Sequence, residues 1–365
     1  MGHSTIAIAD TPDLLTAEWL TAALGPHLGG GRVTAAHASP VGTGQMCDSL
    51  RLALTYEGAP ATAPASVVAK LPAADPTSRA TALSLRSYEK EVRFYQQLAP
   101  DLPIRTPTVF HADIDPATAS FVLLLEDMAP AQAGDQLAGC SPAVVASAID
   151  ELVHLHAPRW GDPTLAEMEW LHGDIEAGRA FLGMLLPNLW AGFKARYGDV
   201  LDPHVVPVGE DLFAHLGAYL TLTGSPLTIT HGDYRLDNLL LDPDDGHVLG
   251  VVDWQTVAVG PALHDVAYVM GAGLLPEDRR PVEEELVRRY HDGLLAAGID
   301  GFDWDTCWHE HRRGTFAGLV MAVAASMLVE QTERGDLMFL AMASRHAQHA
   351  LDLDAVELLR SGTPG

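Results

Sequence analysis

The segment ITHGDYRLDNLLLDPDDGHVLGVVDWQ, residues 229–255, constrains the fold of this chain more than any other stretch. It holds two apolar runs separated by the turn sequence DPDDG at 242–246, which predicts a short β-hairpin. Asp233 precedes the first run, Asn238 begins it, and Asp253 lies at the end of the second run. The segment therefore predicts a strand–loop–strand frame that brings carboxylate and amide oxygens together.

The spacing of these polar residues suits phosphoryl transfer. That reaction needs an acceptor hydroxyl to be aligned and deprotonated, and Mg²⁺ to neutralise charge on the phosphates. A hard cation takes oxygen ligands, which Asn238 and Asp253 can supply, while Asp233 must stay off the metal to meet the hydroxyl. A second HGD, at 172–174, has Arg179 five residues after its Asp in place of Asn, so we interpret it as a helix start.

Composition excludes several classes of function. Lys+Arg is 22 against Asp+Glu 48, a net charge of −26, which argues against nucleic acid and anionic membrane surfaces as partners. Cys47, Cys140 and Cys307 are far apart and form no CxxC, so neither a disulfide framework nor a thiolate zinc site is predicted. With no signal peptide and the apolar run 315–329 too short to span a membrane, we expect a cytoplasmic protein.

Hydrophobic periodicity predicts an α+β chain in two lobes. Residues 1–127 are β-rich, and residues 128–365 are mainly helical and carry the hairpin. Strands are predicted at 32–41, 48–57, 66–72, 106–115, 120–128, 227–230, 238–242 and 247–254. Helices are predicted at 11–25, 78–98, 142–156, 176–197, 208–222, 281–297 and 304–352. Thr16 is expected to cap the first helix and Gly25 to end it.

HGDYRLDN followed by VVDWQ resembles the aminoglycoside phosphotransferase/choline kinase-like superfamily, relatives of the protein kinases. GPALHDVAYVMGAG, at 260–273, resembles a bacterial branch near the ecdysteroid-kinase-like proteins. The resemblance extends over roughly residues 40–270 and is most specific at 231–265. It implies a protein-kinase-like two-lobe fold with a nucleotide cleft between the lobes, ATP as donor with GTP possible, and Mg²⁺.

The resemblance also implies residue roles in the C-terminal lobe. Asp233 orients or deprotonates the acceptor hydroxyl, and Asn238 and Asp253 bind Mg²⁺. Arg235 is left open between a contact to the γ-phosphate and a structural salt bridge. Other matching positions are structural, with His231 bracing the loop and Asp265 bonding loop backbone. DWQ replaces the protein-kinase DFG, which argues against a protein-kinase activation loop.

The N-terminal lobe carries matching nucleotide-binding features. Lys70 ends the apolar run VVAK, where it fits the strand lysine that contacts the α- and β-phosphates. Its carboxylate partner is predicted to be Glu91, which shares a helix face with Phe94 and Tyr95, rather than Glu89. The segment with Gly42 and Gly44 would be a phosphate-covering hairpin, although Cys47 stands where the family pattern has its third glycine. Glu126 and Met128 would lie in the hinge that binds adenine through its backbone.

These observations predict an ATP-dependent kinase that phosphorylates a hydroxyl of a small molecule, such as a natural product or an aminoglycoside-like metabolite. The alternative is a nucleotide-binding pseudokinase without turnover; a protein kinase or nucleotidyl transferase is disfavoured. Apolar side chains in the C-terminal helices hint at an apolar acceptor: Trp304, Trp308, Phe316, Met321, Met327 and Phe339. His309 and His311 diverge on a helix, which we expect to be solvated or to line a pocket. Oligomeric state is not readable.

Overall fold

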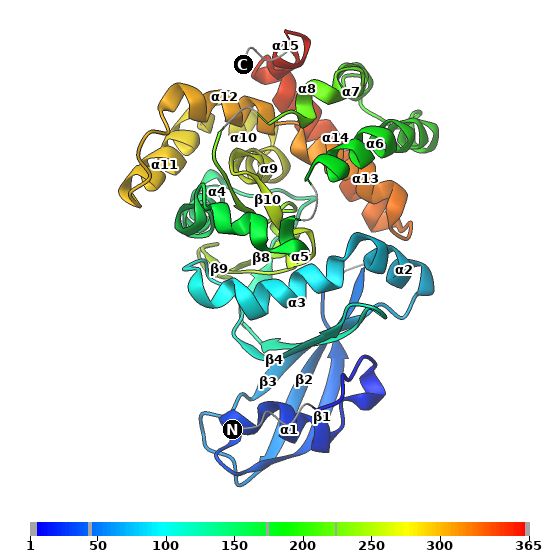
Figure 1. Cartoon of the computed structure of the whole chain (residues 1–365), viewed down its shortest axis with the longest axis vertical. Helices are drawn as coiled ribbons and strands as arrows, with labels where there is room; N and C mark the ends of the chain where they lie inside the picture. Colours follow the sequence, from blue (N-terminus) through cyan, green and yellow to red (C-terminus); the bar gives the residue numbers. More distant parts are fainter. Residues whose placement is uncertain (1–5, 43–45, 173–174, 223–224, 362–365) are drawn as a thin grey trace. The chain divides into compact units, whose positions relative to one another are not determined.

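The computed structural model describes residues 6–42, 46–172, 175–222 and 225–361, and most of its helices and strands are labelled in Figure 1. The chain divides into two units. Unit 1 consists of Met1–Asp101, Thr106–Ala129 and Asp253–Gln255. Unit 2 consists of Leu102–Arg105, Pro130–Val252 and Thr256–Gly365. The combination of an antiparallel sheet in unit 1 with a mainly helical unit 2 confirms the α+β class.

Unit 1 is built on a five-stranded antiparallel sheet with strand order β1-β2-β3-β5-β4. Its strands are β1 (Arg32–Pro40), β2 (Cys47–Glu57), β3 (Ser66–Pro72), β4 (Val109–Asp115) and β5 (Ser120–Glu126). Its helices are α1 (Ala17–Leu28), α2 (Pro76–Leu85) and α3 (Ser87–Gln97). The β-branched and leucine-rich strands β3 and β5 are largely buried, as expected for the centre of a sheet. All five predicted strands of this part of the chain are confirmed.

Two helix predictions in unit 1 are wrong in their bounds. Thr16 does cap α1, its Oγ1 accepting from Trp19 N at 3.1 Å, but the helix passes Gly25 and ends at Gly29, whose φ of +56° suits a glycine. The predicted single helix 78–98 is two helices, α2 and α3, that meet at Arg86. Arg86 has a φ of +56°, a left-handed conformation that ends α2 and starts α3 in a new direction.

Unit 2 contains two small antiparallel sheets, one of β7 and β10 and one of β6, β8 and β9. The strands are β6 (Gln132–Ala133), β7 (Leu227–Thr230), β8 (Leu239–Leu241), β9 (Val248–Val251) and β10 (Ala258–Pro261). The pairing of β8 with β9 confirms the hairpin predicted from the DPDDG turn. The short strands β6 and β10 were not predicted, because neither has an alternating pattern long enough to recognise.

The helices of unit 2 surround these sheets. They are α4 (Pro142–His156), α5 (Glu169–His172), α6 (Ile175–Tyr197), α7 (Val205–Ala214), α8 (Leu216–Leu220), α9 (Leu263–Gly273), α10 (Pro276–Arg279), α11 (Glu283–Ala296), α12 (Trp304–Gly314), α13 (Ala317–Leu328), α14 (Glu333–Asp352) and α15 (Ala355–Arg360). The predicted helix 208–222 is wrong because it breaks at His215, and the predicted helix 304–352 is three helices. No helix in the described ranges is long and apolar enough to cross a membrane.

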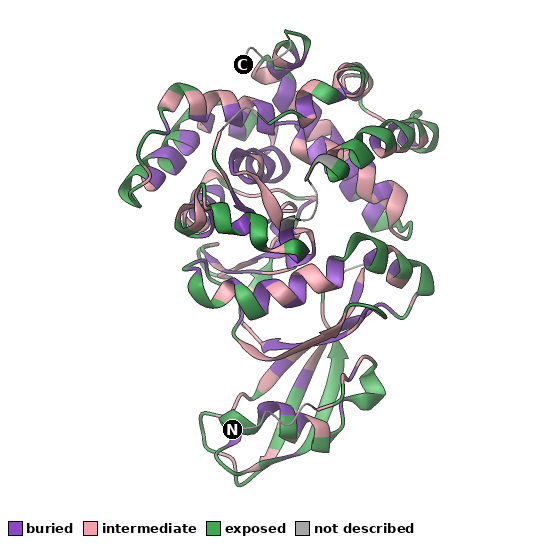
Figure 2. Ribbon diagram, viewed as in Figure 1, coloured by how far each residue is buried: buried purple, intermediate pink, exposed green. Residues whose placement is uncertain are grey.

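Helix α9 lies among the other elements of unit 2 and is almost entirely buried (Figure 2). Of its residues only His264 is partly exposed. The helix contacts α4, α12, α13 and α14, so its position is set by packing on several sides. A helix held in this way is a rigid base from which side chains can be aimed at a neighbouring loop.

Candidate active site

The loop of residues 231–238 joins β7 to β8 and is anchored by Asp265 of α9. The Asp265 carboxylate accepts the backbone NH of His231 at 2.7 Å and of Gly232 at 2.9 Å. Gly232 has a φ of +80°, and a Cβ there would lie 2.8 Å from the Thr256 carbonyl oxygen, so only glycine fits. The bonds to Asp265 bear out the structural role expected of that residue.

Helix α9 makes two further connections to the 231–238 loop, one direct and one through Gln136. Tyr268, one turn after Asp265, donates its hydroxyl to Asp233 Oδ1 at 2.6 Å. Ala272 O accepts from Gln136 Nε2 at 2.5 Å, and Gln136 Oε1 accepts the backbone NH of Leu236 at 3.0 Å. The helix therefore holds the first three residues of the loop directly and Leu236 through Gln136.

His231 braces the loop, as the sequence predicts. It is fully buried; its Nε2 lies 3.0 Å from Val252 O, and Asp233 N donates to its Nδ1 at 3.3 Å. Val252 N donates to Asn238 O at 3.0 Å, and Asp253 is the next residue along the chain. The network ties β9 to the loop and leaves His231 with a structural rather than a proton-transfer role.

The carboxylate of Asp233 is held by three donors. Besides Tyr268 on Oδ1, Arg235 Nε donates to Oδ2 at 3.1 Å and Asn238 Nδ2 donates to Oδ2 at 3.0 Å. Burial by itself would raise the pKa of Asp233, but the charge of Arg235 and the hydroxyl of Tyr268 outweigh it, so the pKa is lowered. The side chain is 17% exposed, so an ionised carboxylate is fixed in orientation and still reachable.

Arg235 forms ion pairs within the loop. It bonds the carboxylates of Asp233 and Asp237, and its Nη1 lies 3.0 Å from Met338 Sδ. Arg334 of α14 is a second partner of Asp237, at 3.4 Å. Of the two roles left open by the sequence, the structural salt bridge is formed here; a contact of Arg235 to the γ-phosphate stays a prediction.

In unit 1, Lys70 lies between two carboxylates. Its Nζ is 2.6 and 2.8 Å from the two oxygens of Glu91 and 3.2 Å from Asp253 Oδ1. Glu89 instead pairs with Arg86 at 2.9 Å, so the structure selects Glu91 as the lysine's partner. Burial would lower the pKa of Lys70, but the charges of Asp253 and Glu91 outweigh it and raise the pKa. The lysine is therefore a buried, protonated cation.

The residues that follow Asp253 explain why Trp and Gln stand in DWQ. Trp254 stacks on Phe94 of α3 with ring centroids 3.7 Å apart, and its backbone NH lies 3.3 Å from Glu91 Oε1. Gln255 Nε2 donates to Glu91 Oε2 at 3.2 Å. Asp253 itself has a φ of +67°, which costs a non-glycine residue of the order of 1 kcal/mol and is typical of functional positions. Sequence reasoning did not find the roles of Trp254 and Gln255, because both depend on contacts with α3.

The expected phosphate-covering hairpin is described only in part. Gly42 follows β1, is exposed and has a φ of +80°; Gly44 lies outside the described residues. Cys47 is buried, and burial raises the pKa of its thiol to about 11, so it is an unreactive packing residue. The covering role of Gly42 and Gly44 remains a prediction.

The predicted hinge follows β5. Glu126 donates its backbone NH to Thr108 O at 2.8 Å, and its carboxylate accepts from the Thr108 hydroxyl at 2.9 Å. Met128 is half-buried just beyond the strand. Asp127, which the sequence did not single out, anchors the segment by accepting from Arg51 at 2.8 and 3.0 Å and from Ser66 at 2.6 Å. Adenine reading by Glu126 and Met128 stays a prediction.

A buried cluster in unit 2 gathers Glu283, His311 and His349, with side-chain ligand atoms within 4.8 Å of one another. The Nε2 atoms of both histidines bond Glu283 Oε1, that of His311 at 2.9 Å, and Arg279 pairs with Oε2. The carboxylate is thus satisfied by three protein donors, and neither histidine Nδ1 has a partner to orient it as metal ligands require. We interpret the cluster as structural. The helix expected to be solvated or to line a pocket, α12, is buried on its His311 face and partly exposed at His309.

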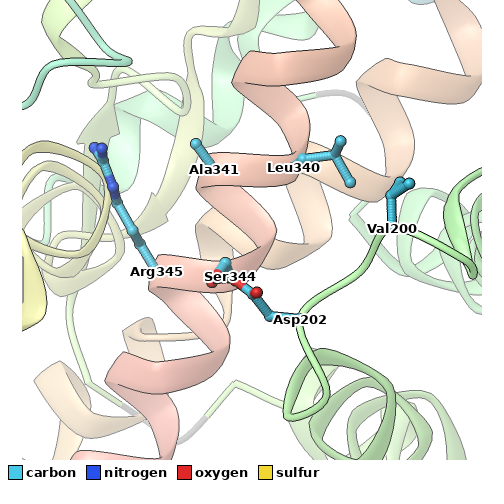
Figure 3. A pocket seen from close by; sticks show the side chains of 6 residues that line it. All are labelled: Val200, Asp202, Leu340, Ala341, Ser344 and Arg345. Carbon is cyan, nitrogen blue, oxygen red and sulfur yellow. Dashed lines mark hydrogen bonds between the residues drawn. The ribbon is translucent and has the colours of Figure 1, made fainter.

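A small hollow of about 210 Å³ lies where α14 passes the segment after α6 (Figure 3). Its lining residues are Val200, Asp202, Leu340, Ala341, Ser344 and Arg345. Ser344 bonds Asp202, whereas Arg345 extends away and donates to Gln136 O at 3.0 Å, Leu137 O at 2.7 Å and Ala272 O at 2.8 Å. The polar side chains Asp202, Ser344 and Arg345 are thus bonded within the protein, and Arg345 supports the backbone of Gln136, which contacts the 231–238 loop.

The apolar side chains suggested as acceptor contacts belong mainly to the core. Phe316 and Phe339 are buried in the main apolar cluster of unit 2, and Met321 and Met327 pack against it. Trp304 covers the Arg288 guanidinium, whose central carbon lies 3.9 Å from the ring centroid. Phe316 and Phe339 are therefore core residues, whereas an apolar acceptor stays a prediction that these contacts do not test.

The fold of this chain is similar to the folds of solved structures of other proteins. A putative aminoglycoside phosphotransferase from Ralstonia eutropha has 17% sequence identity and a TM-score of 0.51, with 92% of this chain and 98% of that chain covered. An ethanolamine kinase from Plasmodium vivax has 10% identity and a TM-score of 0.53, with 92% and 89% covered. At these identities the similarity concerns the fold.

Matches to curated proteins are short. One is to acyl-CoA dehydrogenase family member 10 from Mus musculus, 47% identical over 49 residues, which is 13% of this chain and 5% of that protein. The curated relatives are matched over only 5–18% of their own lengths.

A sequence model of the phosphotransferase enzyme family matches residues 62–307, which is most of the chain. The matched range includes Lys70, Glu91, the 231–238 loop, Asp253 and α9. The chain therefore belongs to the phosphotransferase enzyme family.

Proposed function

We propose that this chain is a Mg²⁺- and ATP-dependent kinase that transfers the γ-phosphoryl group to a hydroxyl of a small molecule, with GTP as a possible second donor. The observation that carries the proposal is the state of Asp233. Its carboxylate has a lowered pKa, is oriented by three donors and is 17% exposed. A carboxylate in this state can align an acceptor hydroxyl and take its proton.

Asn238 and Asp253 are proposed to hold Mg²⁺. The Asn238 amide donates from Nδ2 to Asp233 O at 2.8 Å and to Asp233 Oδ2, so its Oδ1 is the atom that can serve as a metal ligand. Asp253 offers a second carboxylate, 34% exposed. Oxygen ligands of this kind fit Mg²⁺, which supplies neutralisation of charge on the phosphates. Lys70, oriented by Glu91, is proposed to contact the α- and β-phosphates.

The acceptor is proposed only by class, a hydroxylated small molecule. A polycationic aminoglycoside would need carboxylates near the reacting hydroxyl that are not already neutralised. The second carboxylate of the 231–238 loop, Asp237, is paired with both Arg235 and Arg334. Carboxylates that bind a polycationic acceptor would therefore have to come from outside this loop.

The proposal is tested by mass-spectrometric detection of a phosphorylated product. The protein is incubated with Mg·ATP or Mg·GTP and a panel of aminoglycosides, choline-like alcohols, sterols, hydroxyacyl compounds and polyketide-type metabolites. Asp233→Asn is expected to lower turnover by about 10²–10⁴-fold, because it removes the general base. EDTA is expected to abolish turnover and excess Mg²⁺ to restore it.

The matched control is Asp244→Asn, which removes an exposed carboxylate in the β8–β9 turn and should leave turnover unchanged. Full activity of Asp233→Asn would refute the assignment of the base. Nucleotide binding with neither product nor hydrolysis would favour the pseudokinase alternative. Hydrolysis of ATP without a product would show that the acceptor lies outside the panel.

A further inference from the structure

The two oxygens of the Asp233 carboxylate have different surroundings. Oδ2 accepts two hydrogen bonds, from Arg235 Nε and from Asn238 Nδ2. Oδ1 accepts one, from the Tyr268 hydroxyl, at 2.6 Å. Each carboxylate oxygen has two lone-pair positions. Among the described residues, therefore, Oδ2 is fully engaged, and Oδ1 keeps one position for a further hydrogen bond.

We propose that Tyr268 is a positioning residue for phosphoryl transfer, whose hydroxyl locks the Asp233 carboxylate so that the remaining lone pair of Oδ1 meets the acceptor hydroxyl. This inference rests on the proposed function and deepens it. In the step, the acceptor O–H bond breaks and its proton passes to Oδ1 as the acceptor oxygen bonds the γ-phosphorus. The bond from the γ-phosphorus to the bridging oxygen breaks, and its electron pair leaves with ADP.

The donors on Oδ2 alone cannot lock the carboxylate. Arg235 and Asn238 both bond Oδ2, and hydrogen bonds tolerate a range of angles, so the group keeps some freedom to turn about the Cβ–Cγ bond, which moves Oδ1 as well. A third bond to Oδ1 from a separate element fixes the plane of the group. Misplacement of a reacting group by about 1 Å is enough to slow a reaction by about 10²-fold.

Tyr268 is suited to this role by its burial. It is 1% exposed, is part of the apolar cluster of unit 2 and packs its ring against His346 with centroids 5.4 Å apart. Burial and the neighbouring Asp233 raise its pKa well above the ordinary value for tyrosine. The hydroxyl is therefore held in one place and stays protonated, so it acts as a donor to Asp233 and not as a base.

The test is Tyr268→Phe, which removes the hydroxyl and keeps the ring. The readouts are kcat and KM for Mg·ATP hydrolysis, in which water is the acceptor, and for any acceptor found in the screen. We expect kcat to fall by about 10–100-fold, the range for loss of a hydrogen bond to a charged group. The KM for Mg·ATP should change by less than about twofold, because Tyr268 orients the base and does not bind the nucleotide.

The matched control is Tyr234→Phe. Tyr234 lies in the same loop, is fully buried and donates its hydroxyl to Ala148 O at 2.9 Å rather than to Asp233. Tyr234→Phe should lose about as much thermal stability as Tyr268→Phe and keep the kcat of the unmodified protein. An equal loss of kcat in both variants would mean that loop stability explains the effect, and would overturn the inference.

The inference and the proposed function fail in distinguishable ways. Unchanged kcat in Tyr268→Phe, with Asp233→Asn inactive, overturns the role of Tyr268 and leaves the kinase assignment intact. Full activity of Asp233→Asn, or no turnover of any kind in the unmodified protein, overturns both. If thermal unfolding shows that Tyr268→Phe does not fold, Tyr268→Met, which removes the same hydroxyl and fills the space with a flexible side chain, is measured against the same expectations.

Discussion

A buried charge has to be paired, and Lys70 shows how this chain pairs one. The side chain is 10% exposed and has the carboxylates of Glu91 and Asp253 within 3.2 Å. Glu91 is in turn bonded by the Trp254 NH and by Gln255, so every charge in the group has polar partners. Such an arrangement adds little net stability over an apolar core, but removal of one member leaves an uncompensated charge.

This asymmetry makes Glu91→Gln a sharp test at the level of one residue. We expect the free energy of unfolding to fall by about 3 kcal/mol, because Lys70 loses the closer of its two counter-charges. Affinity for a fluorescent Mg·ATP analogue should also fall, since the lysine is no longer oriented. Urea unfolding and a fluorescence titration measure the two effects.

The control for this test is Glu89→Gln, which makes the same change two residues earlier in α3. Glu89, whose side chain is 13% exposed, bonds Arg86, whose side chain is 42% exposed. Because the charge left behind on Arg86 is reached by water, Glu89→Gln should lower the unfolding free energy by less than about 1 kcal/mol and leave nucleotide affinity unchanged. If the two variants behaved alike, the assignment of Glu91 as the partner that matters would be wrong.

Among the elements, the break between α2 and α3 decides where Glu91 points. The residues 78–98 have a helical pattern throughout, and nothing in the sequence marks Arg86 as the junction, since it is neither glycine nor proline. The left-handed φ of +56° at Arg86 lets α3 start in a new direction, with Tyr88, Glu91 and Tyr95 all buried. The break is therefore imposed by packing of the two helices rather than by local preference.

Glycine substitution tests this interpretation of the junction. Arg86→Gly should change the free energy of unfolding by less than about 0.5 kcal/mol, because relief of the left-handed strain offsets the greater freedom of glycine in the unfolded chain. Arg93→Gly, the same change inside α3, should cost about 1 kcal/mol. Urea unfolding of the pair compares them directly. Equal destabilisation by both would show that Arg86 is not strained in the native protein.

The elements that could be predicted are those whose sequence signals lie in the element itself or next to it. Two elements lie where they are predicted, because residues next to them determine where they begin or end. They are strand 66–72, bounded by Pro64 and Pro72, and helix 142–156, which begins at Pro142 after Ser141. The breaks at Arg86 and His215 carry no such signal. The short strands β6 and β10 exist only because partner strands pair with them.

The candidate site divides in the same way. Asp233, Asn238 and Asp253 were predicted because a fixed spacing joins them, and Lys70 because a lysine at the end of an apolar strand is unusual. Tyr268 and Gln136 were missed because they meet the loop only through tertiary structure. A partial signal did exist for Tyr268, which lies three residues after Asp265 and so shares its helix face. Gln136 has no sequence signal that we can identify.

At the scale of the molecule, unit 2 encloses polar groups that tie its long helices together. Glu283 of α11 receives hydrogen bonds from His311 of α12 and His349 of α14, and Arg279 adds an ion pair. His346 is equally buried and lies 3.1 Å from Thr315 O through its Nδ1. Burial lowers the pKa of His349 to about 4 and that of His346 to about 3, so both imidazoles are neutral in the native state at neutral pH.

These two histidines predict how stability changes with pH. In the unfolded chain a histidine has a pKa of about 6.5, so as the pH falls below that value the unfolded state binds protons that the native state does not. The free energy of unfolding should therefore be constant at higher pH and decline as pH falls from about 6.5 towards 4, by about 1–2 kcal/mol per histidine at pH 5.

Urea unfolding at pH 7.5 and pH 5.0 measures the decline. His349→Gln should make the decline smaller by about 1–2 kcal/mol, even though the variant is less stable at both pH values. His27→Gln, which alters an exposed histidine of α1, should leave the decline unchanged. A stability that is the same at pH 7.5 and pH 5.0 in the unmodified protein would contradict the assignment of neutral, buried imidazoles to the core of unit 2.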